Sequence, residues 1–140
     1  MKGRSSAMEW LKAFMTLIGR VLLVLIFLNS GIGKIGDFQG TAQYMAKFGM
    51  SNITLFLIGA IVFEVIGSLS VILGYFTRLG TLLILIFLIP ATLIFHNNFS
   101  DRVQMIMFMK NLSMFGGCLI LFAMGPGRLS LDYFLRGKKI

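Results

Sequence analysis

The sequence predicts an all-α protein, a transmembrane four-helix bundle with a short amphipathic helix in its first outer loop. The chain is 57% hydrophobic, and its mean hydropathy of +0.90 is too high for an ordinary soluble domain. A helix of about 20 residues crosses a hydrocarbon core of roughly 30 Å. Apolar stretches near this length occupy residues 12–32, 53–75, 79–96 and 105–124. They leave room for one domain over residues 1–140.

The net charge of +8 indicates membrane topology rather than nucleic acid binding, because the basic residues gather at helix ends and in the tails. With four spans, one side of the membrane carries Lys2, Arg4, Lys12, Arg78, Arg128, Arg136, Lys138 and Lys139. The opposite side and its helix ends carry Lys34, Lys47, Arg102 and Lys110. This bias places both termini in the cytoplasm. The lipid bilayer is the expected environment, and no nucleic acid partner is expected.

Cysteine and histidine usage excludes several kinds of chemistry. The lone Cys118 forms no internal disulfide or redox pair, and we expect it to pack inside the fourth span. One histidine and one cysteine do not make a protein-only metal site. Lys2 and Arg4 precede an apolar stretch, but no small-residue cleavage site follows, so we expect a retained first helix.

The first span begins at Trp10, a residue typical of the membrane interface. Arg20 follows ten residues later, at a depth of about 15 Å if the membrane begins at Trp10. A guanidinium keeps its charge, so Arg20 must either snorkel to the interface or pair inside the bundle. The depth favours pairing.

Residues 29–51 are rich in glycine and polar residues. Within them Tyr44, Met45 and Phe48 recur at helical spacing, which predicts the short amphipathic helix on the outer face. Such a helix acts either as a lid or as a connection that floats at the interface, and the sequence leaves both readings open.

The second span places one carboxylate, Glu64, near its middle. A charge at this depth costs about 2.5–3.5 kcal/mol on insertion scales, so it should face the bundle interior and have a partner. Glu64 is either ionised and paired or protonated and hydrogen-bonded to a neighbouring helix. Gly67, Ser68, Ser70 and Gly74 follow on this span and predict a close approach of another helix, with Ser70 and Gly74 as a pair of small residues four apart.

The third and fourth spans add further polar side chains. Pro90 interrupts the hydrogen bonding of the third span. His96 ends this span and is either a solvated or capping residue or part of a site. Lys110 and Asn111 lie about one and a half turns into the fourth span. Ser130 is placed to cap a short final turn over residues 131–135.

Arg20, Glu64, Lys110 and Asn111 fall at depths that long side chains can bridge, so a cluster inside the bundle is feasible. Such a cluster keeps spare positive charge, which suits an anion or the carbonyl oxygens of a quinone. The alternative is a buried ion-pair network that only fixes helix packing. We take Arg20, Glu64, Lys110, Asn111 and His96 as the candidate site residues.

The order of these residues resembles the DoxX family of four-helix membrane proteins over residues of about 17 to 132. The residues that carry the resemblance are Arg20, Phe27, Gly31, Lys34, Glu64, Gly67, Gly74, Arg78, His96, Lys110, Asn111, Gly116 and the run from Gly125 to Asp132. The resemblance implies a helical bundle of the bacterial inner membrane. Some relatives are subunits of thiosulfate:quinone oxidoreductase, and others are linked to redox or detoxifying complexes.

Three functions follow as hypotheses. The first is a membrane subunit of a redox or detoxification complex that binds a quinone or similar lipophilic ligand among the helices. It needs a protein partner or a second copy of the chain, because the sequence carries no dinucleotide fingerprint or convincing haem ligand pair. The second is a non-catalytic scaffold or assembly factor for a periplasmic partner. The third is a pathway for small solutes or protons.

Reporter fusions test the predicted topology. Because basic residues favour the side that the termini share, fusions at residue 1 and at residue 140 should both report cytoplasm. A reporter inserted within residues 36–50 should report the opposite side. A C-terminal fusion that reports periplasm would contradict four spans with both termini inside.

Overall fold

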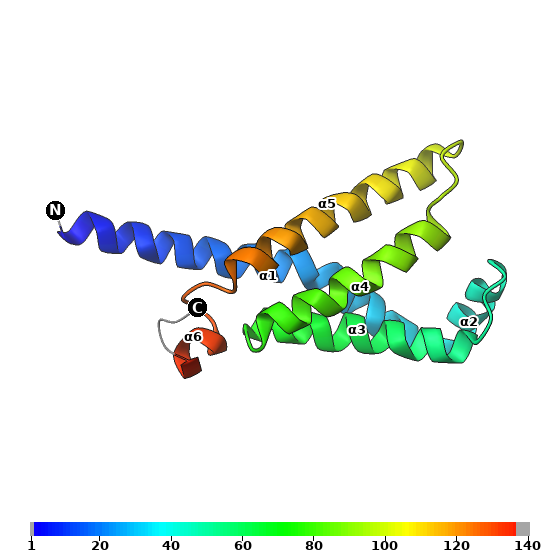
Figure 1. The fold of residues 1–140 in the computed structure, drawn as a ribbon, viewed down its shortest axis with the longest axis horizontal. Coiled ribbons are helices and arrows are strands. Elements are labelled where there is room, and N and C mark those ends of the chain that lie inside the picture. The colour runs from blue at the N-terminus through cyan, green and yellow to red at the C-terminus, as the bar shows by residue number, and fades with distance from the viewer. Residues whose placement is uncertain (1, 137–140) are drawn as a thin grey trace.

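A computed structural model describes residues 2–136 of the chain and confirms the predicted all-α class (Figure 1). Its helices are α1 (Lys2–Gly36), α2 (Phe38–Ala46), α3 (Ile53–Leu73), α4 (Thr77–Phe95), α5 (Arg102–Met124) and α6 (Leu131–Arg136). Of the basic residues assigned to the cytoplasmic side, Lys138 and Lys139 lie outside the described residues. The side chains of Lys2, Arg4 and Arg136 lie outside them too.

Four helices are long and apolar enough to cross a membrane, namely α3, α4, α5 and the part of α1 from Ser6 to Gly36. α3 packs between α1 and α4, and α5 packs against the other side of α4. α5 approaches α1 near the C-terminal end of α5 and diverges from it toward Arg102 (Figure 1). We call the end of the bundle that carries α2 the outer end and the end that carries α6 the inner end.

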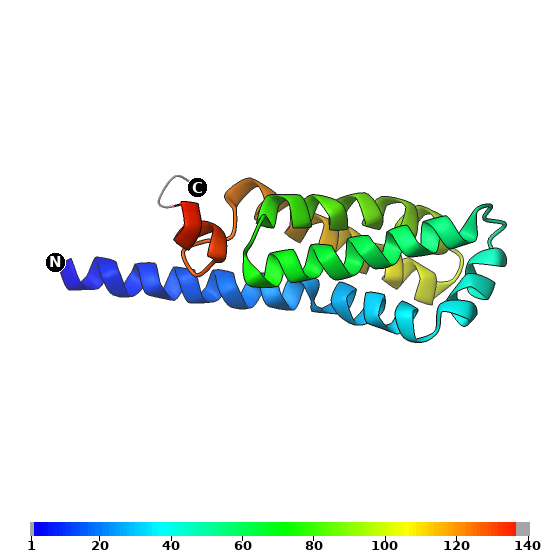
Figure 2. The ribbon, with the colours of Figure 1, turned by 90° about the horizontal axis from the view of Figure 1, so that it is seen from below.

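α1 is displaced along the bundle axis relative to α3. Gly31, five residues before the end of α1, lies against Glu64, eleven residues after the start of α3. The difference of six residues means that α1 ends about 9 Å short of the outer end of α3. α2 packs against α3 at this level. At the inner end α1 continues past the turn between α3 and α4, and α6 lies beside it (Figure 2).

Glycines allow close contact between α1 and α3 and between α3 and α4. A Cβ on Gly31 would lie 2.7 Å from Val65 Cγ2, and a Cβ on Gly67 would lie 2.9 Å from the carbonyl oxygen of Gly80. Both distances are shorter than real side chains allow. The predicted close approach of a helix is therefore confirmed at Gly67 and Ser70, and the helix is α4. Gly74 is not part of this contact, because it ends α3 in the left-handed conformation and lies against Ser130.

The apolar core lies in the middle and inner half of the bundle. It consists of Val24, Phe27, Val71, Ile84, Leu85, Leu88, Cys118 and Leu121. Cys118 is fully buried among these side chains, as expected for a packing residue.

The segment after α5 folds back against the turn between α3 and α4. The carboxylate of Asp132 accepts hydrogen bonds of 2.9 Å from the backbone N–H groups of Phe76 and Thr77 and from the hydroxyl of Thr77. Asp132 is only 5% exposed, and its carboxylate satisfies these donors at the start of α4. Ser130 accepts from the N–H of Tyr133, which confirms its predicted capping role.

Candidate ligand-binding site

Glu64 lies near the midpoint of α3 with only 1% of its surface exposed. Its partner is Lys34 of α1, whose Nζ lies 2.8 Å from Oε2 and 3.1 Å from Oε1. The same ammonium donates to Ser30 Oγ at 2.6 Å and lies 5.6 Å from the centre of the Phe87 ring. The carboxylate in the membrane interior is thus neutralised by a cation on the adjoining helix, as its insertion cost requires.

The local sequence of α1 explains why this ion pair forms. Gly31 and Lys34 are three residues apart and share one face of α1. Because Gly31 has no side chain, the backbone of α3 approaches until Glu64 Cβ and Val65 fill the space. Lys34 leans back toward the N-terminus of α1, as helical side chains do, and this direction brings its ammonium to the level of Glu64.

The ion pair forms one wall of a cavity of about 300 Å³ in the outer half of the bundle, which we call the outer cavity. Its polar lining residues come from α1, α2, α3, α5 and the residue that follows α4, and they are Ser30, Lys34, Thr41, Tyr44, Glu64, His96, Lys110 and Asn111. Its larger apolar lining residues include Ile26, Phe27, Phe87, Leu88, Phe95 and Met114. This combination of a mostly apolar wall with a few convergent polar groups is typical of small-molecule sites.

The polar groups of α5 bring donors to the outer cavity. Asn111, which is 8% exposed, donates from Nδ2 to Thr92 Oγ1 at 3.0 Å, which leaves its carbonyl oxygen and second N–H for other partners. Lys110 contacts the sulfur of Met107 at 3.2 Å and has no acidic partner within residues 2–136. Since Lys34 and Glu64 neutralise each other, Lys110 leaves the cavity with one net positive charge.

α2 closes the outer end of the cavity through an aromatic group. Tyr44 stacks on Phe95 of α4 with ring centres 5.7 Å apart, and Phe48 lies 4.9 Å from Phe95 and 5.1 Å from Tyr44. Nearby, His96 Nδ1 lies 2.8 Å from Gln104 Oε1. α2 is therefore part of the cavity wall, and its movement as a lid stays a prediction.

The structure corrects the predicted surroundings of Arg20. Its guanidinium donates to the carbonyl oxygens of Leu129 at 2.5 Å, Pro126 at 2.7 Å and Ile72 at 3.3 Å. Ile72 lies eight residues from Glu64, or about 12 Å along α3. Arg20 is 3% exposed, so it neither snorkels to solvent nor pairs with the carboxylate. It instead satisfies backbone carbonyls at the inner end of the bundle.

The predicted cluster of Arg20, Glu64, Lys110 and Asn111 is therefore wrong in one member. Glu64, Lys110 and Asn111 line the outer cavity together with His96, whereas Arg20 does not. The predicted depth of Arg20 was wrong because Arg20 lies level with the inner end of α3. Arg20 is therefore at the end of the bundle and not at the depth of Glu64.

Lys34 is the site residue that the sequence reasoning did not assign. The sequence places Lys34 among the outer charges and within the family pattern, whereas the predicted cluster gives Glu64 the cations Arg20 and Lys110. The spacing of Gly31 and Lys34 was the available signal. Among the described residues, no group of three His, Cys, Asp or Glu side chains is placed to hold a metal ion.

These features define a class of protein, a compact four-span membrane bundle with an ion-paired, partly polar cavity in its outer half. The family model named DoxX matches residues 15–97, which include Arg20, Lys34, Glu64 and His96. The chain belongs to the DoxX family.

Two curated relatives from Escherichia coli (strain K12) are similar over most of their length. Inner membrane protein YqjF is 38% identical over 122 residues, which cover 87% of this chain and 92% of the relative. Inner membrane protein YphA is 40% identical over 121 residues, which cover 83% of this chain and 86% of the relative. No solved structure matches the chain significantly.

A double-mutant series tests the Lys34–Glu64 pair. Glu64→Gln keeps the shape of the side chain but strands the Lys34 ammonium, which should lower the free energy of unfolding by about 3 kcal/mol. Lys34→Met combined with Glu64→Gln should recover most of this loss. Thermal unfolding in detergent measures both effects.

Two control combinations assign the partner of Glu64. Arg20→Met or Lys110→Met, each added to Glu64→Gln, should give no recovery, because neither cation contacts the carboxylate. Recovery with Lys110→Met would contradict the pair described here. A Glu64→Gln protein as stable as the wild type would instead support a protonated Glu64.

Proposed function

We propose that this protein is a bacterial inner-membrane subunit of a redox or detoxification complex and binds a quinone or similar lipophilic ligand in the outer cavity. The observation that supports this proposal is the cavity itself, whose lining combines aromatic side chains with Lys110, a cation that has no acidic partner among the described residues. The location follows the two relatives, which are named as inner membrane proteins. Both termini are proposed to lie in the cytoplasm.

The chemistry of the cavity suits a flat ligand with carbonyl oxygens. The ammonium of Lys110 and the amide of Asn111 can donate to such oxygens, and charge-assisted hydrogen bonds of this kind are the stronger ones. Phe27, Phe87 and Phe95 offer ring faces and edges for stacking. The positive charge of Lys110 further favours a ligand that becomes more negative when it is reduced.

A ligand of this class reaches the cavity from the bilayer. The cavity is lined by residues of both α1 and α5, so we place the entry between these two helices. We propose that electrons come from a partner protein or a second copy of the chain on the outer side, because quinone chemistry needs a source or acceptor of electrons.

The rival functions receive less support from the packing. A solute or proton pathway would have to continue from the outer cavity through the core around Val24, Val71 and Ile84, which are apolar and at most 1% exposed. A scaffold that docks a periplasmic partner would use α2 and the following turn, yet Tyr44 and Phe48 of this segment pack on Phe95.

Extraction and titration test the proposed ligand. Protein purified in mild detergent should carry a quinone enriched over the surrounding lipid, detected by mass spectrometry of the organic extract. Lys110→Met should weaken binding of an added short-chain quinone about tenfold, the effect of losing one charged hydrogen bond. Lys47→Met, which removes an exposed lysine outside the cavity, is the matched control.

Each rival predicts a different result. A stable protein partner without any extracted ligand would favour the scaffold, and solute or proton uptake in liposomes would favour the pathway. Absence of quinone enrichment together with unchanged binding in Lys110→Met would contradict the proposed function.

A further inference from the structure

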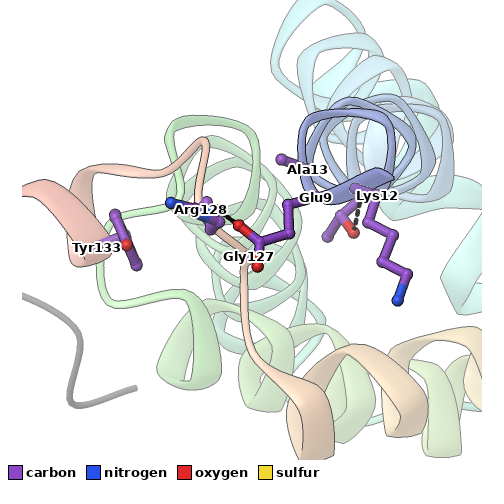
Figure 3. Close-up of a pocket in the computed structure, with 7 residues that line it drawn as sticks. Glu9, Lys12, Ala13, Gly127, Arg128 and Tyr133 are labelled. Carbon is purple, nitrogen blue, oxygen red and sulfur yellow. Dashed lines mark hydrogen bonds and ion pairs between the residues drawn. The ribbon is translucent and has the colours of Figure 1, made fainter. Parts of the chain in front are cut away.

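A second cavity lies at the inner end of the bundle, where α1 passes the segment that follows α5 (Figure 3). We call it the inner pocket. It has a volume of about 370 Å³, and the residues used here are Glu9, Lys12, Thr16, Gly127, Arg128 and Tyr133. It contains two cations and one carboxylate at the end of an apolar bundle, where lipid headgroups lie.

The two cations of the inner pocket differ in their partners, because Arg128 is paired with a carboxylate and, among the described residues, Lys12 is not. Arg128 forms an ion pair with Glu9 and lies over the ring of Tyr133 at 5.9 Å. The hydrogen bond with Glu9 raises the pKa of Arg128 above its ordinary value, so this side chain is always charged. Glu9 lies between Arg128 and Lys12 (Figure 3). Lys12 has no ion pair within the part of the chain that the structure describes, so the pocket keeps one positive charge.

The inner pocket continues into an apolar groove between α1 and α5, which we call the inner groove. The two cavities share Thr16 and Gly127. The groove has a volume of about 460 Å³ and runs toward the bundle middle along Gly19, Leu23, Ile120 and Met124. Thr16 and Leu23 are seven residues apart on α1, so the groove is about 10 Å long.

A buried hydrogen-bond donor without a partner in the described chain lies beside the inner groove. Arg20 lines the inner groove, four residues or about 6 Å deeper than Thr16. Its terminal nitrogens donate to backbone carbonyls, but its Nε is buried and has no hydrogen-bond partner among the described residues. A buried donor of this kind is costly unless a partner accepts from it.

We propose that the inner pocket and inner groove together bind one anionic phospholipid. Its phosphate lies at Lys12 and Arg128, its ester groups lie at the level of Arg20, and one acyl chain lies between α1 and α5. The charged headgroup and the acyl chain of a phospholipid follow one another in the order in which the cations and the apolar groove occur along α1. The single excess charge of the pocket complements a phosphodiester.

Native mass spectrometry of the full chain in detergent tests this site. Titration with dioleoyl phosphatidylglycerol should show one tightly bound lipid, and dioleoyl phosphatidylcholine should bind about fivefold more weakly, since a basic residue near anionic lipid contributes about 1 kcal/mol. Lys12→Gln should remove this preference. Lys47→Gln, an exposed lysine at the other end of the bundle, is the control for charge alone.

A second variant tests the groove independently of charge. Nothing lies within 4 Å of a Cβ on Gly19, so Gly19→Leu should fold, fill the inner groove and lower binding of both lipids at least tenfold. Gly33→Leu, also on α1 and equally open, should bind lipid as the wild type does. Equal binding of the two lipids by the wild type, or normal lipid binding by Gly19→Leu, would overturn the proposal. So would displacement of the lipid by inorganic phosphate.

Discussion

The contact between Gly31 and Glu64 sets the register between α1 and α3, and much of the architecture depends on that register. It places Lys34 beside a carboxylate that would otherwise be an unpaired charge in the membrane interior. It also leaves α1 about 9 Å short of the outer end of α3 and extended at the inner end. α2 lies at the outer end, where α1 stops short of α3, and α6 lies at the inner end, where α1 extends beyond the bundle.

The same register separates the buried polar groups into two sets with different chemistry. At the outer set, Lys34 and Glu64 neutralise each other beside Lys110 and Asn111, and the aromatic residues of the outer cavity surround them. At the inner set, Arg20 donates to carbonyls and the carboxylate of Asp132 accepts from amides. Apolar core side chains lie between the sets, so each set interacts with its own surroundings. The quinone proposed for the outer cavity and the phospholipid proposed for the inner end can therefore bind at the same time.

Hydropathy and glycine spacing predict much of this fold, because the bilayer requires long apolar helices whose backbone groups are satisfied internally. The four spans, the amphipathic α2, the Gly67 contact and the Ser130 cap were predictable for this reason. The pairing of Glu64 was not, because depth counted from span ends assumes that all helices start at the same level. The displacement of α1 violates that assumption, and as a result Lys34 rather than Arg20 lies at the level of Glu64. Residue order resembling the DoxX family could not reveal this displacement either, since it carries no distances.

The most direct test of this account is the distance between Lys34 Nζ and Glu64 Cδ in membrane-embedded protein. The chain contains only two glutamates, Glu9 and Glu64, so glutamate labelled at Cδ with ¹³C gives few signals, and Glu9→Gln leaves one. Solid-state dipolar recoupling to ¹⁵N-labelled lysine side chains should show an ion-pair distance within about 4 Å. This coupling should vanish in Lys34→Met and persist in Lys110→Met. A coupling that persists in Lys34→Met, or no coupling to any lysine, would contradict the account.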